Sequence, residues 1–153
     1  MNGTNLQEAL SLRDTLCSAS TTVLEMMFFT EGIPAQGAPT HVDPIACQLH
    51  ASGEVNGTFS VAIDRAALVV LCESFYGDAP TSNQPFELLC ECTNMIAGST
   101  LSLYSPSHFC PLSSPQLCNI AAHLEGFAQP DATLLSFAVD RGLISIAWSL
   151  RTK

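Results

Sequence analysis

The sequence predicts an α/β protein of the α+β type, with helices packed on one face of a largely antiparallel sheet. Two stretches alternate apolar and polar residues around a short turn that contains glycine, which is typical of β-hairpins. Three other stretches repeat their apolar residues with the period of a helix. The order along the chain is helix, hairpin, helix, helix, short strands, hairpin, which favours antiparallel pairing between neighbouring strands. We expect residues 1–153 to form one domain.

The first two predicted helices cover residues 9–29 and 65–76. The apolar residues of the first helix recur at helical spacing and are Leu10, Leu12, Leu16, Val23, Leu24 and Phe28. Asp64 is well suited to cap the start of the second helix, and Gly77 is well suited to end it.

The third predicted helix begins after Ser82 or Asn83, either of which can cap it. Pro85 is tolerated in the first turn of a helix. The helical pattern continues to about Leu103.

The first predicted hairpin pairs residues 45–51 with residues 59–63. We expect Asn56 and Gly57 to supply the positive φ angles that its loop needs. The preceding segment, 30–44, is rich in Gly and Pro and is expected to be a connection or an irregular edge.

The second predicted hairpin pairs Leu134–Val139 with Leu143–Leu150 across the turn Asp140-Arg141-Gly142. Segment 105–126 is interrupted by Pro and Ser and leaves room for one or two short strands.

The composition excludes some classes of function. The net charge of −9 arises from 14 acidic and 5 basic residues, which argues against nucleic-acid binding because that needs clustered Lys and Arg. Charged residues make up 12% of the chain, about half the usual share. So few charges indicate extensive buried surface or a face covered by a second subunit.

The chain shows no targeting or metal-binding signal. No apolar run approaches the roughly 20 residues of a membrane span, and no basic region followed by an apolar region marks a secretory signal. We therefore expect a cytoplasmic protein. The seven cysteines include no C-x-x-C pair and are expected to be reduced and mostly buried. The four histidines lack H-E-x-x-H spacing, so no metal site is expected.

A thin polar stripe lies on the third predicted helix. At about 100° per residue, Glu87, Glu91, Asn94 and Gly98 fall on one line, which we call the acidic stripe. The predicted core face opposite contains Phe86, Leu89, Thr93, Ile96, Ala97 and Thr100. The residues that flank the stripe are apolar and comprise Leu88, Met95, Cys90 and Leu101. Gly98 weakens a helix by about 1 kcal/mol relative to Ala but leaves room for another surface. We interpret the stripe as a docking face; the alternative is an ordinary solvent-exposed helix face.

The segment ELLCECTNMIAG, residues 87–98, resembles the signature helix of the CheC/CheX/FliY family of chemotaxis phosphatases. That motif has an acidic or Ser position, then E-x-x-N, and then a small run that ends in Gly. The resemblance to the CheX branch extends over roughly residues 10–150, including the hairpin and helix of residues 51–77 and the final hairpin.

The resemblance implies a hydrolase of two-component signalling that removes the aspartyl phosphate from a CheY-like response regulator. It implies that Glu91 engages a lysine of the regulator and that Asn94 orients the attacking water. A carboxamide suits that task because it both donates and accepts hydrogen bonds. The partner-binding residues are expected to be Glu87, Met95, Gly98 and Pro115. The resemblance further implies no cofactor on this chain, Mg²⁺ in the active site of the partner, and a homodimer through sheet edges.

The sequence departs from the family pattern in three places. Glu87 stands where the family usually has Asp or Ser. The downstream proline of the family is either Pro115, which we favour, or Pro111. Glu25 on the first helix has no Asn three residues later, which indicates one active site per chain as in CheX.

Three other interpretations remain open. A non-catalytic module of the same fold would dock on receiver domains without dephosphorylating them. A purely structural dimerisation domain would explain the low charge but not the acidic stripe. A thiol nucleophile at Cys90 or Cys92 is disfavoured, because neighbouring Glu87 and Glu91 oppose formation of a thiolate.

Overall fold

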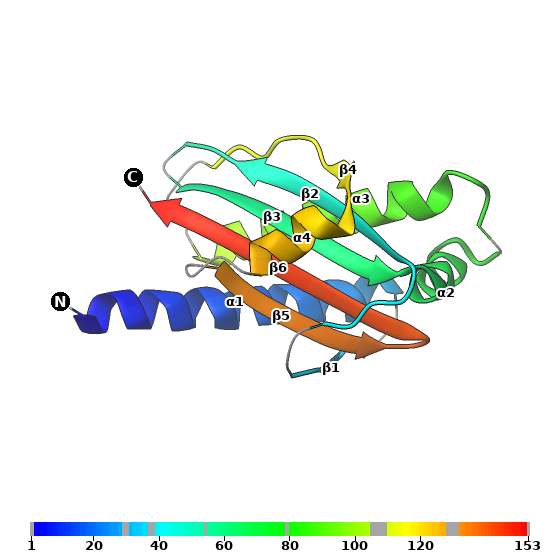
Figure 1. The fold of residues 1–153 in the computed structure, drawn as a ribbon, viewed down its shortest axis with the longest axis horizontal. Coiled ribbons are helices and arrows are strands. Elements are labelled where there is room, and N and C mark those ends of the chain that lie inside the picture. The colour runs from blue at the N-terminus through cyan, green and yellow to red at the C-terminus, as the bar shows by residue number, and fades with distance from the viewer. Residues whose placement is uncertain are drawn as a thin grey trace.

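The protein folds as one six-stranded sheet with helices on both of its faces (Figure 1). The computed structural model describes residues 2–28, 31–36, 39–53, 55–78, 80–104, 110–127 and 132–152. The strand order is β1-β5-β6-β3-β2-β4, and every neighbouring pair is antiparallel. The helices are α1 (Asn2–Phe28), α2 (Arg65–Tyr76), α3 (Gln84–Tyr104) and α4 (Ile120–Phe127). The strands are β1 (Ile33–Pro34), β2 (Pro44–Ala51), β3 (Val55–Asp64), β4 (Gln116–Cys118), β5 (Ala132–Val139) and β6 (Gly142–Thr152).

The α+β class is confirmed, as is the packing of the three predicted helices on one face of an antiparallel sheet. Helices α1, α2 and α3 lie behind the sheet in Figure 1, on what we call the helical face. Helix α4 lies on the opposite side, which we call the outer face, in contact with β2, β3, β5 and β6.

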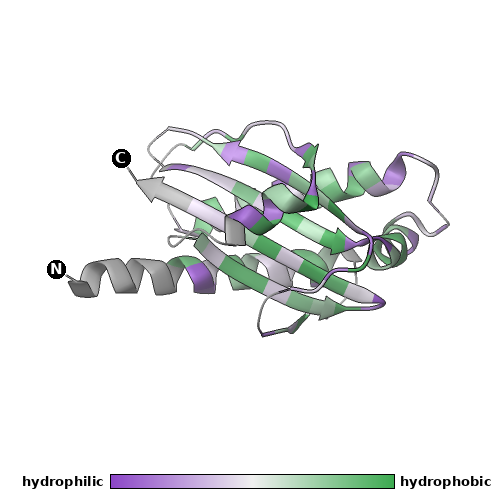
Figure 2. Ribbon diagram, in the orientation of Figure 1, coloured by the Kyte–Doolittle hydropathy of each residue, from purple (hydrophilic) through white to green (hydrophobic). Residues whose placement is uncertain are grey.

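The two faces of the central strands differ in side-chain size. The buried large residues of β3 and β6 are Phe59, Val61, Ile63, Ile144, Ile146 and Trp148. The buried residues that alternate with them are small and comprise Ser60, Ala62, Ser145 and Ala147. Phe59 and Trp148 pair in register and pack edge to face at 4.9 Å between ring centroids. Trp148 is thus part of the core. The large side chains fill the space under α1–α3, and apolar colouring dominates the central strands (Figure 2).

The first helix matches its predicted apolar positions where they are described. Leu12, Leu16, Val23 and Leu24 are all buried. The structure does not describe the side chains of Leu10 and Phe28. None of the helices in the described part of the chain has the length and apolar character that crossing a bilayer requires.

The predicted turn of the first hairpin is wrong. Asn56 and Gly57 lie within β3, where Gly57 pairs with Ala51 and Asn56 pairs with Arg151 of β6. Gly53 supplies the positive φ angle instead, at 99°. The strand continues through Asn56-Gly57 because β3 pairs with strands on both sides, and this second pairing keeps its backbone extended.

The second hairpin is confirmed with a tighter loop. Val139 pairs with Gly142, so only Asp140 and Arg141 form the turn, and Arg141 has φ 65°.

The predicted cap of α2 is not formed: Asp64 occupies the N-cap position but makes no side-chain cap hydrogen bond. Its carboxylate accepts the backbone N–H groups of Val42 and Leu143 instead, each at 3.0 Å. Gly77 ends α2 in the left-handed conformation, as predicted.

The described part of segment 105–126 contains one short strand, β4, as predicted, and the start of a helix, α4, that was not predicted. Helix α4 has eight residues, too few to display a clear helical period beside the Pro- and Ser-rich stretch before it. Its local signal is Asn119, whose Oδ1 accepts the N–H of Ala122 at 2.8 Å as a helix cap.

Two glycines provide a matched pair of stability predictions. A Cβ at Gly142 would lie 2.7 Å from Oδ2 and 2.8 Å from Cβ of Asp64, whereas a Cβ at Gly98 would meet nothing within 4 Å. We expect Gly142→Ala to lower the free energy of unfolding by about 1–3 kcal/mol through overpacking. Gly98→Ala is expected to raise it by up to about 1 kcal/mol through helix propensity. Urea unfolding of both variants checks this, and equal destabilisation by the two would contradict the packing described.

Candidate functional site

The orientation of α3 is set by the residues that it buries. Five residues of the predicted core face, Leu89, Thr93, Ile96, Ala97 and Thr100, are at most 1% exposed. The two buried threonines satisfy their hydroxyls within the helix, since Thr93 Oγ1 donates to the Leu89 carbonyl and Thr100 Oγ1 to the Ile96 carbonyl, each at 2.7 Å. A helix buried along one side in this way has no freedom to rotate about its axis. The opposite side must therefore face away from the sheet.

The acidic stripe lies on that opposite side, as predicted. Glu87, Glu91 and Asn94 are exposed, and Gly98 is half-buried. Among the described residues, no hydrogen bond or ion pair engages the side chains of Glu91 or Asn94. These two side chains are available to a partner, and the open space at Gly98 lets a surface approach the helix backbone beside them.

The apolar border of the stripe is less exposed than the projection indicated. Leu88 and Leu101 are buried, at 1% and 6% exposure. Met95 and Cys90 are half-buried and pack against the core. Of the flanking residues, Met95 and Cys90 are thus the ones with surface to offer a partner.

An aromatic pair next to the stripe was missed by the sequence analysis. Phe75 and Tyr76, at the C-terminal end of α2, stack edge to face at 4.9 Å and are 42% and 37% exposed. Partial burial raises the pKa of the Tyr76 phenol, and Cys72, Glu87 and Glu91 add to the rise. Helices α2 and α3 pack against each other, and Glu87 and Glu91 of the stripe both act electrostatically on Tyr76.

The two candidate prolines differ in their surroundings. Pro115 is half-buried and directly precedes β4. Pro111 is exposed, and its carbonyl accepts the Ser52 N–H at 3.0 Å. Contact of Pro115 with a partner stays a prediction.

Cys92, one residue after Glu91, is not an activated nucleophile. Burial raises the pKa of the Cys92 thiol to about 12, with a further contribution from Glu91. Cys90 Sγ lies 3.6 Å from Cys47 Sγ, and burial raises the pKa of the Cys47 thiol to about 12. A nucleophilic cysteine needs a depressed pKa, so Cys92 loses its support as a nucleophile.

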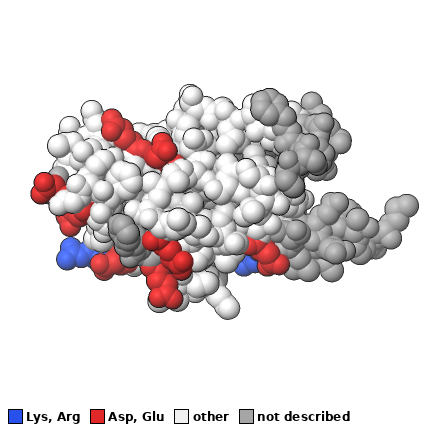
Figure 3. Space-filling view, turned by 180° about the vertical axis from the view of Figure 1, so that it is seen from behind, with Lys and Arg blue, Asp and Glu red and all other residues white. Residues whose placement is uncertain are grey.

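Acidic side chains surround the stripe, and the stripe itself is the exposed side of a helix rather than a cavity. Acidic side chains are scattered over the helical face, with few basic ones among them (Figure 3).

Within the described residues, no three His, Cys, Asp or Glu side chains are grouped as a metal site would need. A hollow of about 630 Å³ is lined by Val42, Asp43, Asp64, Arg65, Ala66, Arg141 and Gly142, none of them on the stripe. Small molecules usually bind in concave sites, so the stripe is better suited to a protein partner.

No protein-family model and no curated protein matches the sequence. Solved structures do match the fold. The chemotaxis protein CheX from Vibrio vulnificus superposes with a TM-score of 0.73 at 15% identity, covering 90% of this chain and 95% of that one. A CheC-like superfamily protein from Shewanella sp. PV-4 gives a TM-score of 0.74 at 14% identity, covering 92% and 97%.

A third match is a chain of the CheX–CheY–BeF3–Mg²⁺ complex from Borrelia burgdorferi. Its TM-score is 0.70 at 15% identity, covering 90% of this chain and 96% of that one. The architecture is therefore shared along nearly the whole length of these proteins, although few residues are identical. This chain has the fold of the CheX and CheC-like chemotaxis proteins.

Proposed function

We propose that this protein hydrolyses the aspartyl phosphate of a CheY-like receiver domain, with Glu91 and Asn94 as the acting pair. The observation that carries the proposal is the position of these two residues. They are exposed and three residues apart on α3, a helix whose orientation is set by its buried side, within a CheX-like fold. The complex that contains CheX and CheY supports a receiver domain as the class of partner.

The proposed reaction requires mainly that this chain position the attacking water and the receiver. An acyl phosphate is already a good phosphoryl donor, so holding a water in line with the phosphorus supplies most of what catalysis needs. Asn94 offers an acceptor and a donor to that water. Glu91 offers a carboxylate to a cation on the receiver, which fixes the geometry. Mg²⁺ is expected to belong to the receiver, and we expect this chain to bind no cofactor of its own.

The surroundings of the pair support a protein substrate. The acidic stripe favours a partner that presents positive charge, and the half-exposed Met95 and aromatic Phe75–Tyr76 pair offer apolar contact area next to it. Glu87 and Pro115 are proposed to lie within this contact area. The expected homodimer and cytoplasmic location stay predictions.

A receiver-binding module without catalysis is the second candidate. The open space at Gly98 and the exposed aromatic pair favour docking as such and do not require Asn94 to act. The two candidates differ in the role of Asn94, which catalysis requires and docking alone does not.

We expect the wild-type protein to accelerate the loss of phosphate from a Mg²⁺-loaded CheY-type receiver, and Asn94→Ala to reduce that acceleration by at least about 100-fold. Glu91→Ala is expected to reduce it by at least about tenfold, because the docking geometry is lost. Single-turnover decay of radiolabelled acyl phosphate, over a panel of receivers, measures these rates.

Because both side chains are exposed, each variant should unfold within about 0.5 kcal/mol of wild type. Urea unfolding provides this control. Acceleration that survives in Asn94→Ala would contradict the proposed catalytic role, and binding without acceleration by wild type would identify the docking module instead.

We expect Gly98→Leu to weaken binding of a BeF3⁻-loaded receiver at least about tenfold, because the added side chain fills the space through which the partner approaches. Ser99→Leu is the matched control, since Ser99 is exposed on the same helix about 100° away from Gly98. Titration calorimetry measures both affinities. Equal affinities would mean that the partner does not approach along the stripe.

A further inference from the structure

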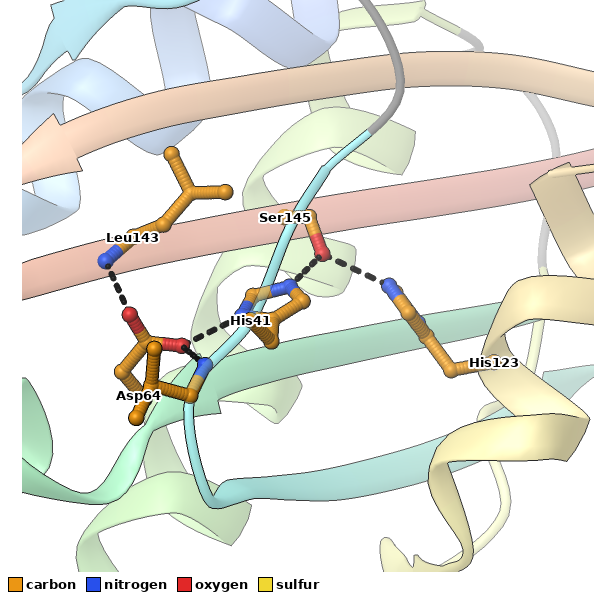
Figure 4. A network of polar contacts seen from close by, with 6 residues as sticks. His41, Asp64, His123, Leu143 and Ser145 are labelled. Atoms are coloured by element: carbon orange, nitrogen blue, oxygen red, sulfur yellow. Dashed lines mark hydrogen bonds and ion pairs between the residues drawn. The ribbon is translucent and has the colours of Figure 1, made fainter.

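The outer face holds a buried polar cluster that has the connectivity of a Ser-His-Asp triad (Figure 4). Asp64 Oδ1 contacts His41 Nδ1 at 2.7 Å, and His41 Nε2 contacts Ser145 Oγ at 2.7 Å. Ser145 is fully buried, however, and its Oγ also contacts His123 Nε2 at 2.8 Å. A triad serine must reach a substrate carbonyl with oxyanion-stabilising donors beside it. The cluster therefore joins separate parts of the fold and offers no nucleophile to a substrate.

A pair of thiols on the helical face combines close contact with access from outside. Cys47 Sγ of β2 lies 3.6 Å from Cys90 Sγ of α3, and both cysteines are free thiols. Cys47 has no exposed surface and belongs to the core, whereas Cys90 is half-buried at the border of the acidic stripe. Helix α3 packs on β2, so the contact joins two elements at positions 43 residues apart. A small solute can thus reach one thiol of the pair while the other lies beside it in the core.

The two sulfurs are close enough to form a bond after a small movement. A disulfide has an S–S length of about 2.05 Å, so the sulfurs must approach each other by about 1.5 Å from their separation of 3.6 Å. Movement on this scale is within the reach of rotation about the two Cα–Cβ bonds. Cys118 is placed differently, because its partner in the sheet is Ala46, whose side chain points to the opposite face from that of Cys47. Cys90 is therefore the thiol best placed to bond to Cys47.

The order in which the two thiols react follows from their burial. The thiolate is the form of cysteine that attacks an oxidant, and burial raises the pKa of the Cys47 thiol to about 12. Cys47 is therefore a poor first nucleophile, and it has no exposed surface. An oxidant reaches Cys90 first, since part of its surface is exposed. A charged Cys90 also contributes to the raised pKa of Cys47, and this contribution disappears once the Cys90 sulfur is oxidised.

We propose that Cys47 and Cys90 form a redox-active dithiol, which a hydroperoxide converts into a disulfide that links α3 to β2. The bond fixes α3 to the sheet one residue before Glu91 and draws the Cys90 sulfur from the border of the acidic stripe toward the core. The proposal is independent of the reaction proposed for Glu91 and Asn94.

The oxidation proceeds in two balanced steps. In the first, the Cys90 sulfur attacks one oxygen of hydrogen peroxide, the O–O bond breaks, and Cys90 becomes a sulfenic acid while water leaves. In the second, the Cys47 sulfur attacks the Cys90 sulfur, the S–O bond breaks, and the departing hydroxide takes the Cys47 proton to leave as water. The two thiols together lose two electrons, which the peroxide gains. Because the second step is intramolecular, the fixed position of Cys47 favours it over further oxidation of Cys90.

Peptide mapping of the folded wild-type protein after treatment with hydrogen peroxide tests the proposal. Once free thiols are alkylated, cleavage after glutamate releases Cys47 within residues 32–54 and Cys90 within residues 88–91, apart from Cys92. In protein that runs as a monomer on a non-reducing gel, we expect the crosslink between these peptides to be at least about tenfold more abundant than any other disulfide-linked pair. Dithiothreitol should remove it. A Cys47 that stays a free thiol, whether or not Cys90 is oxidised, would overturn the proposal, as would a Cys47 crosslinked mainly to another cysteine.

Two variants distinguish this pair from the other thiols. We expect Cys90→Ser to lower the yield of disulfide on Cys47 at least about tenfold, because the neighbouring sulfur is lost. Cys118→Ser, the same change at another half-buried cysteine, should keep the yield of the wild type. Equal losses of yield in the two variants would contradict the assignment of Cys90 as the partner.

Urea unfolding of the wild-type protein tests whether the bond fits the native fold, even if a variant fails to fold. The disulfide closes a loop between positions 43 residues apart, which disfavours the unfolded chain. We therefore expect the folding equilibrium constant of the oxidised protein to exceed that of the reduced protein at least about tenfold. Cys90→Ser treated with the same peroxide is the control for methionine oxidation. An oxidised protein no more stable than the reduced one would mean that the bond distorts the fold, and would overturn the proposed native pair.

Discussion

The alternation of large and small side chains along β3 and β6 is the constraint on which the rest of the structure depends. Phe59, Ile146 and Trp148 point to the helical face, where the apolar sides of α1, α2 and α3 cover them. Ser60 and Ser145 point the other way and let α4 and segment 39–43 approach closely. A register shift of one residue would exchange the two faces, so both sides of the molecule depend on the same pairing.

The helical face explains why the acidic stripe is exposed. Helix α3 buries a wide side of Leu, Ile, Ala and internally bonded Thr residues, and this burial determines where Glu91 and Asn94 point. A pair held on such a helix needs no loop to order it before a partner arrives, which limits the entropy lost on binding. Gly98 lowers the stability of the helix, and no described residue packs against the space that its missing side chain leaves. A glycine at this position is explained if a partner approaches the helix there.

The features that local patterns encode could be predicted from the sequence. The stripe on α3 follows from helical period alone, and the second hairpin from alternation around a Gly-containing turn. The buried contacts that join His41 to Asp64 and Ser145, and His123 to Ser145 and Ser60, could not be predicted, because they link residues 23, 104, 22 and 63 positions apart. Asp64 shows the limit clearly. Its place before a helix predicts a cap, but the tertiary partners His41, Val42 and Leu143 take its carboxylate instead. Similarly, Asn56-Gly57 has the composition of a turn, yet pairing with β6 keeps it in a strand.

The likeness in fold extends over 90–92% of this chain, whereas the proposed chemistry rests on two side chains. The concentration dependence of receiver dephosphorylation separates catalysis from docking most directly. If Asn94 orients the attacking water, Asn94→Ala lowers the maximal rate by at least about 100-fold and leaves the half-saturating receiver concentration within about threefold of wild type. An unchanged maximal rate with a raised half-saturating concentration would contradict that role and make Asn94 a docking residue.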